Sequence, residues 1–215
     1  MNSLPNQFFY SKKEDRLNVL SHGIGFILSI IGLIFLINKG LQNFNLTYFM
    51  SLLIYGLSLS TMYIASTLYH NSKTANSRYN LRMFDMISIY ILIAGSYTPF
   101  TLILLKDNQG WLLFTIIWLL AFFGIAWKVF TVGKYNLVTT SLYIFMGGLW
   151  LFFYESFVSQ IPSDALWWIT AGCFTYLAGV IFYLLDNKLK YNHFIWHLFV
   201  LAASGCHYIS IYFYI

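Results

Sequence analysis

Charged residues are scarce in this chain of 215 residues, where 12 lysines and arginines and 7 aspartates and glutamates make up only 9% of the sequence. A soluble domain has about a quarter of its residues charged, so the composition excludes a sizeable soluble domain. Cysteine is also rare. Cys173 and Cys206 both fall inside apolar runs and match no metal or redox spacing, so we interpret them as small packing residues.

Long apolar runs are abundant instead, and each is long enough to cross a hydrocarbon core of about 30 Å. Runs of about 20 residues favour helices over the ten-residue alternating strands of a membrane barrel. We therefore predict an all-α polytopic membrane protein, a bundle of seven transmembrane helices. The predicted spans are residues 17–37, 46–69, 84–105, 110–130, 137–154, 165–185 and 194–214, of which the fifth is the shortest.

Two segments follow from these spans: a polar, basic segment at residues 1–16 and a membrane domain at residues 17–215. No small-residue cleavage site follows the first apolar run, so we expect no removed signal peptide. The expected location is the cell membrane, the inner membrane in a bacterium, with membrane lipid as the surrounding partner.

The distribution of basic residues predicts the orientation. With seven spans and an inner N-terminus, ten of the twelve basic residues face the cytoplasm, as the positive-inside rule requires. Those ten are Lys12, Lys13, Arg16, Lys73, Arg78, Arg82, Lys128, Lys134, Lys188 and Lys190. Only Lys39 and Lys106 face out. We therefore predict a cytoplasmic N-terminus and an outer C-terminus. The basic residues are scattered over loops that face anionic headgroups and accompany no nucleic-acid-binding motif, so we expect no nucleic-acid partner.

Ionisable residues inside the spans are the candidates for function, because a charge within a membrane is costly. His70 ends span 2 in STLYH, and Asp85 is predicted in the first turn of span 3 in RMFDMISIY. His193 and His197 fall in the first two turns of span 7. The alternating directions of the spans bring all four residues to one depth, near the cytoplasmic leaflet.

The spacing of these residues favours a metal site. His193 and His197 are four residues apart, so on a helix they share one face and can offer two imidazoles to one metal. His70 would add a third nitrogen, and three protein ligands with one water are the catalytic form of a zinc site. Asp85 would hold or deprotonate that water, or orient a ligand. Ser66, four residues before His70, would hydrogen-bond the water or a substrate carbonyl. A hydrogen-bonded network between helices, or a proton relay, is the alternative.

Two further histidines and a proline lie within the spans. His22 is early in span 1 and is a weaker ligand candidate, since it also lies in the inner half. His207 lies ten residues beyond His197, about 15 Å further along a helix, which excludes it from the same site. Pro99 in GSYTPF predicts a kink in span 3.

Several motifs along the chain occur together in one family. They are EDRLNVLSHGIG near the N-terminus, STLYH, FDMISIYILIAGSYTPF, LYIFMGGLW, AGCFTYLAGVIFY and HFIWHLFV. The chain resembles the hemolysin III family, the bacterial branch of the progestin and adipoQ receptor family, which is related to alkaline ceramidases. Cys173 departs from the small, glycine-like residue expected in span 6.

The resemblance implies a heptahelical fold with zinc near the cytoplasmic leaflet. Its ligands would be His70, His193 and His197, with Asp85 as the water-holding aspartate and Ser66 as the site serine.

Two classes of function remain open. One is a zinc-dependent hydrolase of a lipid amide or ester, with Asp85 as general base. The other is a protein without enzymatic activity, in which structural zinc joins spans 2 and 7 and which senses lipid, maintains the membrane or lyses host cells. A transporter is a weaker alternative, because we find no paired interrupted helices of the kind that inverted repeats show.

Overall fold

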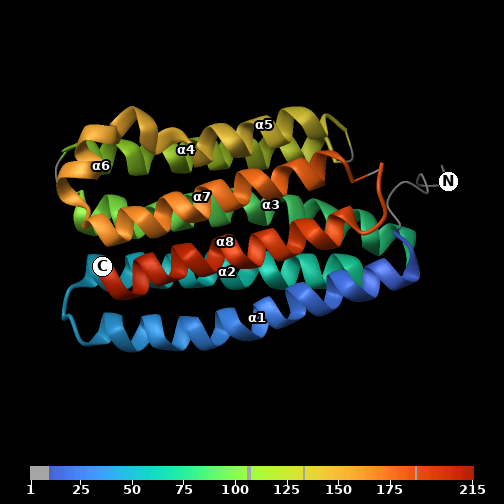
Figure 1. Ribbon diagram of the computed structural model, residues 1–215, viewed down its shortest axis with the longest axis horizontal. Helices are drawn as coiled ribbons and strands as arrows, with labels where there is room; N and C mark the ends of the chain where they lie inside the picture. The colour runs from blue at the N-terminus through green and yellow to red at the C-terminus, as the bar shows by residue number, and fades with distance from the viewer. Residues whose placement is uncertain (1–9, 106–107, 133, 187) are drawn as a thin grey trace.

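The structure is a computed structural model that describes residues 10–105, 108–132, 134–186 and 188–215. Within these ranges the regular secondary structure is helical, and seven helical segments are long and apolar enough to cross a membrane. The helices lie along one common axis, and α1 begins at the end of the bundle opposite to the end where α8 finishes (Figure 1). The predicted all-α bundle of seven spans is confirmed.

The helical elements follow one another along the chain with short connections. They are α1 (Lys12–Leu41), α2 (Leu46–Asn71), α3 (Ala75–Pro99), the π-helical turn η2 (Phe100–Leu104), α4 (Asn108–Phe130), α5 (Asn136–Gly147), the 3₁₀ segment η3 (Leu149–Phe153), α6 (Tyr154–Gln160), α7 (Ser163–Leu184) and α8 (Asn192–Tyr214). Each span packs on the next one along the chain, and α8 also packs on α1.

The first three helices begin at polar capping side chains, which accept hydrogen bonds from backbone N–H groups of the first turn. The caps and their donors are Ser11 with Glu14 (3.2 Å), Asn45 with Tyr48 (3.0 Å) and Thr74 with Ser77 (3.3 Å). These caps lie in polar sequence, so α1 and α3 begin before the apolar runs that predicted them.

The early start of α3 corrects one prediction. Span 3 was predicted to begin at residue 84, but the helix begins at Ala75. Asp85 therefore lies about three turns inside α3 rather than in its first turn. The reason is that the polar stretch before Asp85 continues the helix beyond the apolar run, where hydropathy gives no signal.

The fifth span is longer than predicted and is interrupted. The segment that crosses the bundle runs from Asn136 to Gln160, not to residue 154, and its α-helix ends at Gly147. The Tyr97 hydroxyl of α3 lies 2.9 Å from the Met146 carbonyl and 3.0 Å from that of Gly147, and it accepts from the Trp150 N–H at 3.2 Å. This hydroxyl supplies hydrogen bonds that the interrupted helix cannot make for itself.

The disturbance predicted at Pro99 takes the form of a π-helical turn. Proline has no N–H to donate to the preceding turn. α3 ends at Pro99 and the chain continues as η2. The Thr98 and Thr101 hydroxyls donate to backbone carbonyls one turn earlier, those of Ala94 (2.9 Å) and Tyr97 (3.0 Å). Threonine hydroxyls therefore satisfy carbonyls around the break.

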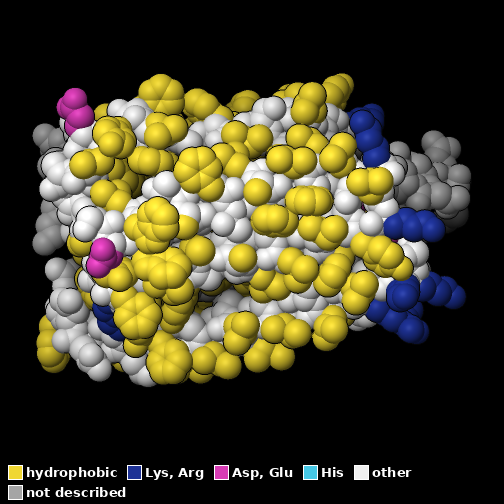
Figure 2. All heavy atoms as spheres, viewed as in Figure 1, with side chains coloured by type: hydrophobic (Ala, Val, Ile, Leu, Met, Phe, Trp, Pro, Cys, Tyr) yellow, Lys and Arg dark blue, Asp and Glu magenta, His cyan; other side chains and the backbone are white. Residues whose placement is uncertain are grey.

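Basic side chains gather at one end of the bundle, whereas the flank in view is largely apolar (Figure 2). The directions of the helices put all ten basic residues predicted to share a side at the end where α1 begins. Lys39 lies at the other end, and Lys106 lies outside the described residues. The charge asymmetry that predicted the orientation is therefore present in the fold.

Close packing between α2 and α3 depends on Gly95. A Cβ at this position would lie 2.7 Å from the Ser58 Cβ, too close without a shift of one helix. Gly95→Ala is expected to lower the free energy of unfolding by about 1–3 kcal/mol, measured by unfolding in detergent. Gly205→Ala is the control, because a Cβ there meets nothing within 4 Å. Equal stability of the two variants would contradict this packing.

Candidate metal centre

Three buried histidines meet at the end of the bundle where α1 begins. His70 comes from the last turn of α2, and His193 and His197 come from the first two turns of α8. Their exposed fractions are 2%, 6% and 1%. One ring nitrogen of each lies within 4.8 Å of a ring nitrogen of the others, so the three rings can hold a metal ion. The predicted convergence of these histidines is present in the structure.

Every one of these rings uses its Nδ1 atom for a hydrogen bond to an oxygen. The pairs are His70 with Asp15 Oδ1 (3.1 Å), His193 with Asp186 Oδ2 (3.2 Å) and His197 with Ser21 Oγ (3.1 Å). Two of the acceptors are carboxylates, and the third is a hydroxyl whose own proton is donated to the Asn18 carbonyl at 3.0 Å. These oxygens favour protonation at Nδ1 in the three rings; the Asn18 amide nitrogen also lies 3.3 Å from His70 Nδ1.

This assignment of protons leaves Nε2 as the nitrogen with a free lone pair. The Nε2 atom of His70 is buried and has no hydrogen-bond partner within the described ranges. Histidines that bind metals typically donate their other ring N–H to a carboxylate or a similar oxygen, which fixes the tautomer and the ring orientation. An unpartnered Nε2 beside two matching imidazoles fits a metal ligand set, and imidazole suits zinc among other metals.

The carboxylate of Asp15 connects the site to the bundle. Its Oδ1 atom accepts from Arg78 Nη2 at 2.8 Å as well as from His70. The Arg78 side chain is 1% exposed, also donates to the Ser72 carbonyl at 3.1 Å, and lies over the Tyr69 ring at 4.9 Å. One carboxylate on α1 thus joins the end of α2 to the start of α3.

Asp186 plays the corresponding part for His193 from the connection between α7 and α8. Burial alone would raise the pKa of this carboxyl, but hydrogen bonds from His193 and from the Tyr10 hydroxyl (2.6 Å) outweigh burial, so its pKa lies below the usual value. Burial raises the pKa of Tyr10 well above its usual value, and the charge of Asp186 adds to that effect. Asp186 is therefore held ionised and Tyr10 protonated.

Asp85 and Ser66 lie together beside the three histidines without joining them. Ser66 is buried on α2, and its hydroxyl interacts with the Asp85 carboxyl, which also interacts electrostatically with His193. Asp85 does not belong to the group whose ligand atoms lie within 4.8 Å of one another.

The other two histidines have different surroundings. His22 stacks on His197 with ring centroids 3.5 Å apart and an interplanar angle of 8°. Both of its ring nitrogens are buried without a hydrogen-bond partner in the described part of the chain. His207 lies at the far end of α8, with its Nε2 atom 4.0 Å from Cys173 Sγ. Neither residue belongs to the group of three.

The family is shown by comparison with known proteins. A model of the family described as Haemolysin-III related matches residues 10–208. This chain belongs to that family.

Curated relatives agree with the family match. Hemolysin-3 of Bacillus cereus is 38% identical over 203 residues, covering 94% of this chain and 92% of that protein. The Hemolysin-3 homolog of Bacillus subtilis is 35% identical over 205 residues, covering 95% and 96%. The human Monocyte to macrophage differentiation factor is 31% identical over 173 residues, covering 75% and 69%. This family member is a multi-pass protein of the bacterial cell membrane.

The oxygens that contact the histidine Nδ1 atoms in this family member were not predicted from the sequence. Asp15, Asn18 and His22 follow at spacings of three and four residues, and Ser21 is beside them, so all four share one side of α1. A polar stripe of this kind in an otherwise apolar helix was the available signal. Asp186 had no comparable signal, because it lies in the connection after α7.

The shared carboxylate of Asp15 is expected to stabilise the fold. Asp15→Asn removes the negative charge that the buried Arg78 and His70 share, which is expected to cost about 3 kcal/mol in unfolding free energy. Chemical unfolding of metal-free protein in detergent measures the loss. Glu155→Gln, which removes an exposed acid at the other end of the bundle, is the matched control. A loss of unfolding free energy no larger than that of the control would show that the Asp15 contacts do not stabilise the fold.

Proposed function

We propose that the three histidines bind zinc and that the protein is a zinc-dependent hydrolase of a lipid amide or ester. The observation that carries this proposal is the common orientation of the three rings, whose Nδ1 atoms each lie 3.1–3.2 Å from an oxygen. One ring nitrogen of each histidine lies within 4.8 Å of those of the other two, so the three rings can offer nitrogen ligands to one ion. Structural zinc sites close all four positions with protein ligands, whereas hydrolytic sites keep one position open.

The side chains around the histidines suit hydrolysis. When bound, zinc would act as a Lewis acid toward a carbonyl and would bring the pKa of a water ligand to about 7. Asp85, whose carboxyl interacts with Ser66 and electrostatically with His193, would accept a proton from the attacking water as a general base. Ser66 can orient that carboxylate or donate to the substrate carbonyl. Asp15, Asp186 and Ser21 keep the rings in place.

A lipid substrate follows from the position of the site. We place the end of the bundle that carries the histidines and the ten basic residues on the cytoplasmic side, by the positive-inside rule, with residues 1–16 in the cytoplasm. An amide or ester linkage lies where acyl chain meets headgroup, so a lipid in the inner leaflet would bring that linkage to the depth of the histidines. The apolar flank of the bundle (Figure 2) faces those lipids directly.

A second candidate is a protein without enzymatic activity. His70 lies on α2 and the other two histidines on α8, so zinc would also join these two helices. Relatives carry the name Hemolysin-3, which favours cytolysis as the role of such a stabilised bundle. Turnover distinguishes the two candidates.

Metal content and hydrolysis, measured on the same detergent-purified samples, test the proposal. Wild-type protein is expected to hold one zinc per chain and to hydrolyse an N-acyl amide lipid or the matching ester. His197→Ala is expected to lose the zinc. Asp85→Asn is expected to keep the zinc while hydrolysis falls at least about 100-fold, as for removal of a general base.

His207→Ala is the control, because it removes a histidine from the same helix outside the group of three. It is expected to keep both zinc and turnover. Zinc in the wild type without turnover of amide or ester would favour the second candidate. Wild-type protein that binds no added zinc would overturn both.

The partner of His193 gives a further prediction about affinity. Asp186→Asn weakens the acceptor that orients this ring, so the dissociation constant for zinc is expected to rise about 10–100-fold. Competition with a fluorescent zinc chelator measures it. Asp164→Asn, an exposed aspartate at the other end of α7, is the control. Identical zinc affinities in the two variants would mean that Asp186 does not support a ligand.

A further inference from the structure

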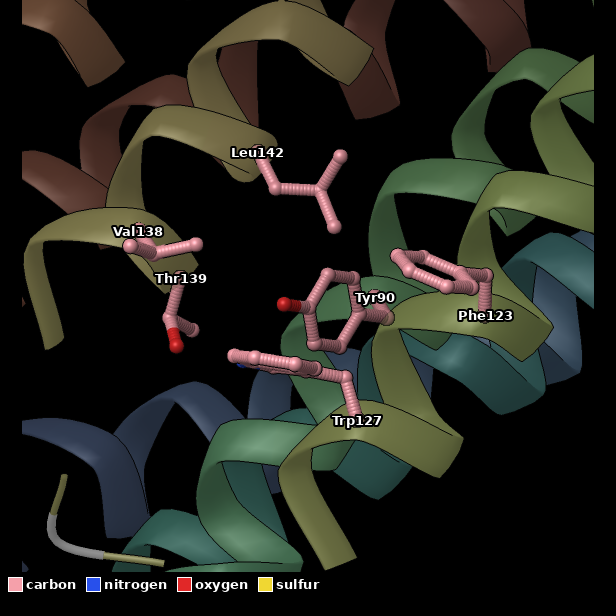
Figure 3. Close-up of a pocket in the computed structure, with 6 residues that line it drawn as sticks. All are labelled: Tyr90, Phe123, Trp127, Val138, Thr139 and Leu142. Atoms are coloured by element: carbon pink, nitrogen blue, oxygen red, sulfur yellow. The ribbon is translucent and has the colours of Figure 1, made fainter. Parts of the chain in front are cut away.

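A separate pocket lies on the flank of the bundle between α3, α4 and α5 (Figure 3). Its volume is about 210 Å³, and it is lined by Tyr90, Phe123, Trp127, Val138, Thr139 and Leu142. Phe123 is 62% exposed and Val138 53%, so the rim of the pocket faces the hydrocarbon of the bilayer. The lining includes none of the candidate zinc ligands, Asp85 or Ser66.

A polar group points into this apolar pocket. The Tyr90 side chain is fully buried, and its hydroxyl lies near Thr139 but makes no hydrogen bond of normal geometry to any described residue. In Figure 3 this hydroxyl points from α3 toward Val138 and Thr139 of α5. A buried hydroxyl without a partner costs free energy, and a ligand oxygen in the pocket would remove that cost.

A buried positive charge contacts Thr139, one of the residues that line the pocket. Lys128 is 0% exposed, and its Nζ atom donates to Thr139 Oγ1 at 3.3 Å and to the Lys134 carbonyl at 3.4 Å. Both acceptors are neutral. None of the ion pairs between described residues includes Lys128. A buried ammonium without a nearby anion is unfavourable. The Lys128 ammonium therefore favours a negatively charged group on the side of the pocket where Thr139 lies.

We propose that this pocket binds an anionic membrane lipid. Its acyl chain lies against Phe123, Val138 and Leu142, one of its oxygens accepts from the Tyr90 hydroxyl, and its negative headgroup complements Lys128. A lipid rather than a soluble anion fits, because the rim is apolar and faces the bilayer. An anionic rather than a zwitterionic lipid fits, because the nearest buried charge is positive.

Native mass spectrometry of the purified chain, titrated with phosphatidylglycerol or with phosphatidylcholine of the same acyl chains, tests this proposal. Wild-type protein is expected to bind phosphatidylglycerol at least about tenfold more tightly. Val138→Trp fills the pocket and is expected to weaken that binding at least about tenfold. Leu137→Trp is the matched control, because Leu137 is 68% exposed and does not line the pocket; its binding is expected to equal that of the wild type.

Two smaller substitutions measure the contributions of the Tyr90 hydroxyl and the Lys128 charge separately. They also keep the proposal testable if Val138→Trp does not fold. Tyr90→Phe removes only the hydroxyl and is expected to weaken phosphatidylglycerol binding several-fold. Lys128→Gln is expected to abolish the preference for phosphatidylglycerol over phosphatidylcholine. Zinc content is expected to stay at the wild-type value in all four variants. A negative result for lipid binding would therefore leave the proposed zinc hydrolase untouched.

Three results would overturn the proposal. One is a folded Val138→Trp protein, with an unchanged elution profile and melting temperature, that binds phosphatidylglycerol as the wild type does. Another is equal affinity of the wild type for the two lipids. The third is a Leu137→Trp protein that loses as much affinity as Val138→Trp.

Discussion

The hydrogen bond between Nδ1 of each of His70, His193 and His197 and an oxygen is the interaction on which the candidate site depends. A buried imidazole N–H without an acceptor is costly, so these oxygens determine how the three rings are turned. Here the acceptors on α1 and after α7 fix Nδ1 of all three rings, and Nε2 remains for a ligand. α1 must pack on both α2 and α8 for these bonds to form, which couples the site to the closure of the bundle.

The carboxylates that contact the histidines each belong to a connected group. Asp15 is shared between His70 and Arg78, and Asp186 between His193 and Tyr10. Each carboxylate therefore has more than one donor, as an anion withdrawn from water requires. Tyr90 and Lys128 differ from these carboxylates. The Tyr90 hydroxyl has no hydrogen-bond partner of normal geometry within the described ranges, and the Lys128 ammonium has only neutral acceptors.

Hydropathy and topology were sufficient to predict the bundle and the meeting of His70, His193 and His197, because alternating spans with short connections determine which ends lie together. The start of α3 could not be read from hydropathy, since capping and packing extend the helix through a polar stretch. Asp15 was missed because its partners are distant in sequence, and Asp186 because it lies in the connection after α7, where no periodic pattern marks it. The break in the fifth span depends on Tyr97, a residue of another helix, and no local pattern announces it.

X-ray absorption spectroscopy at the zinc edge of the purified protein tests the central claim most directly. Three histidine ligands predict a first shell of nitrogen and oxygen at about 2.0–2.2 Å, with the outer scattering of imidazole rings and no sulfur. A sulfur shell at about 2.3 Å would place the metal at Cys173 or Cys206 instead. That result would contradict the assignment of the three histidines as the metal centre.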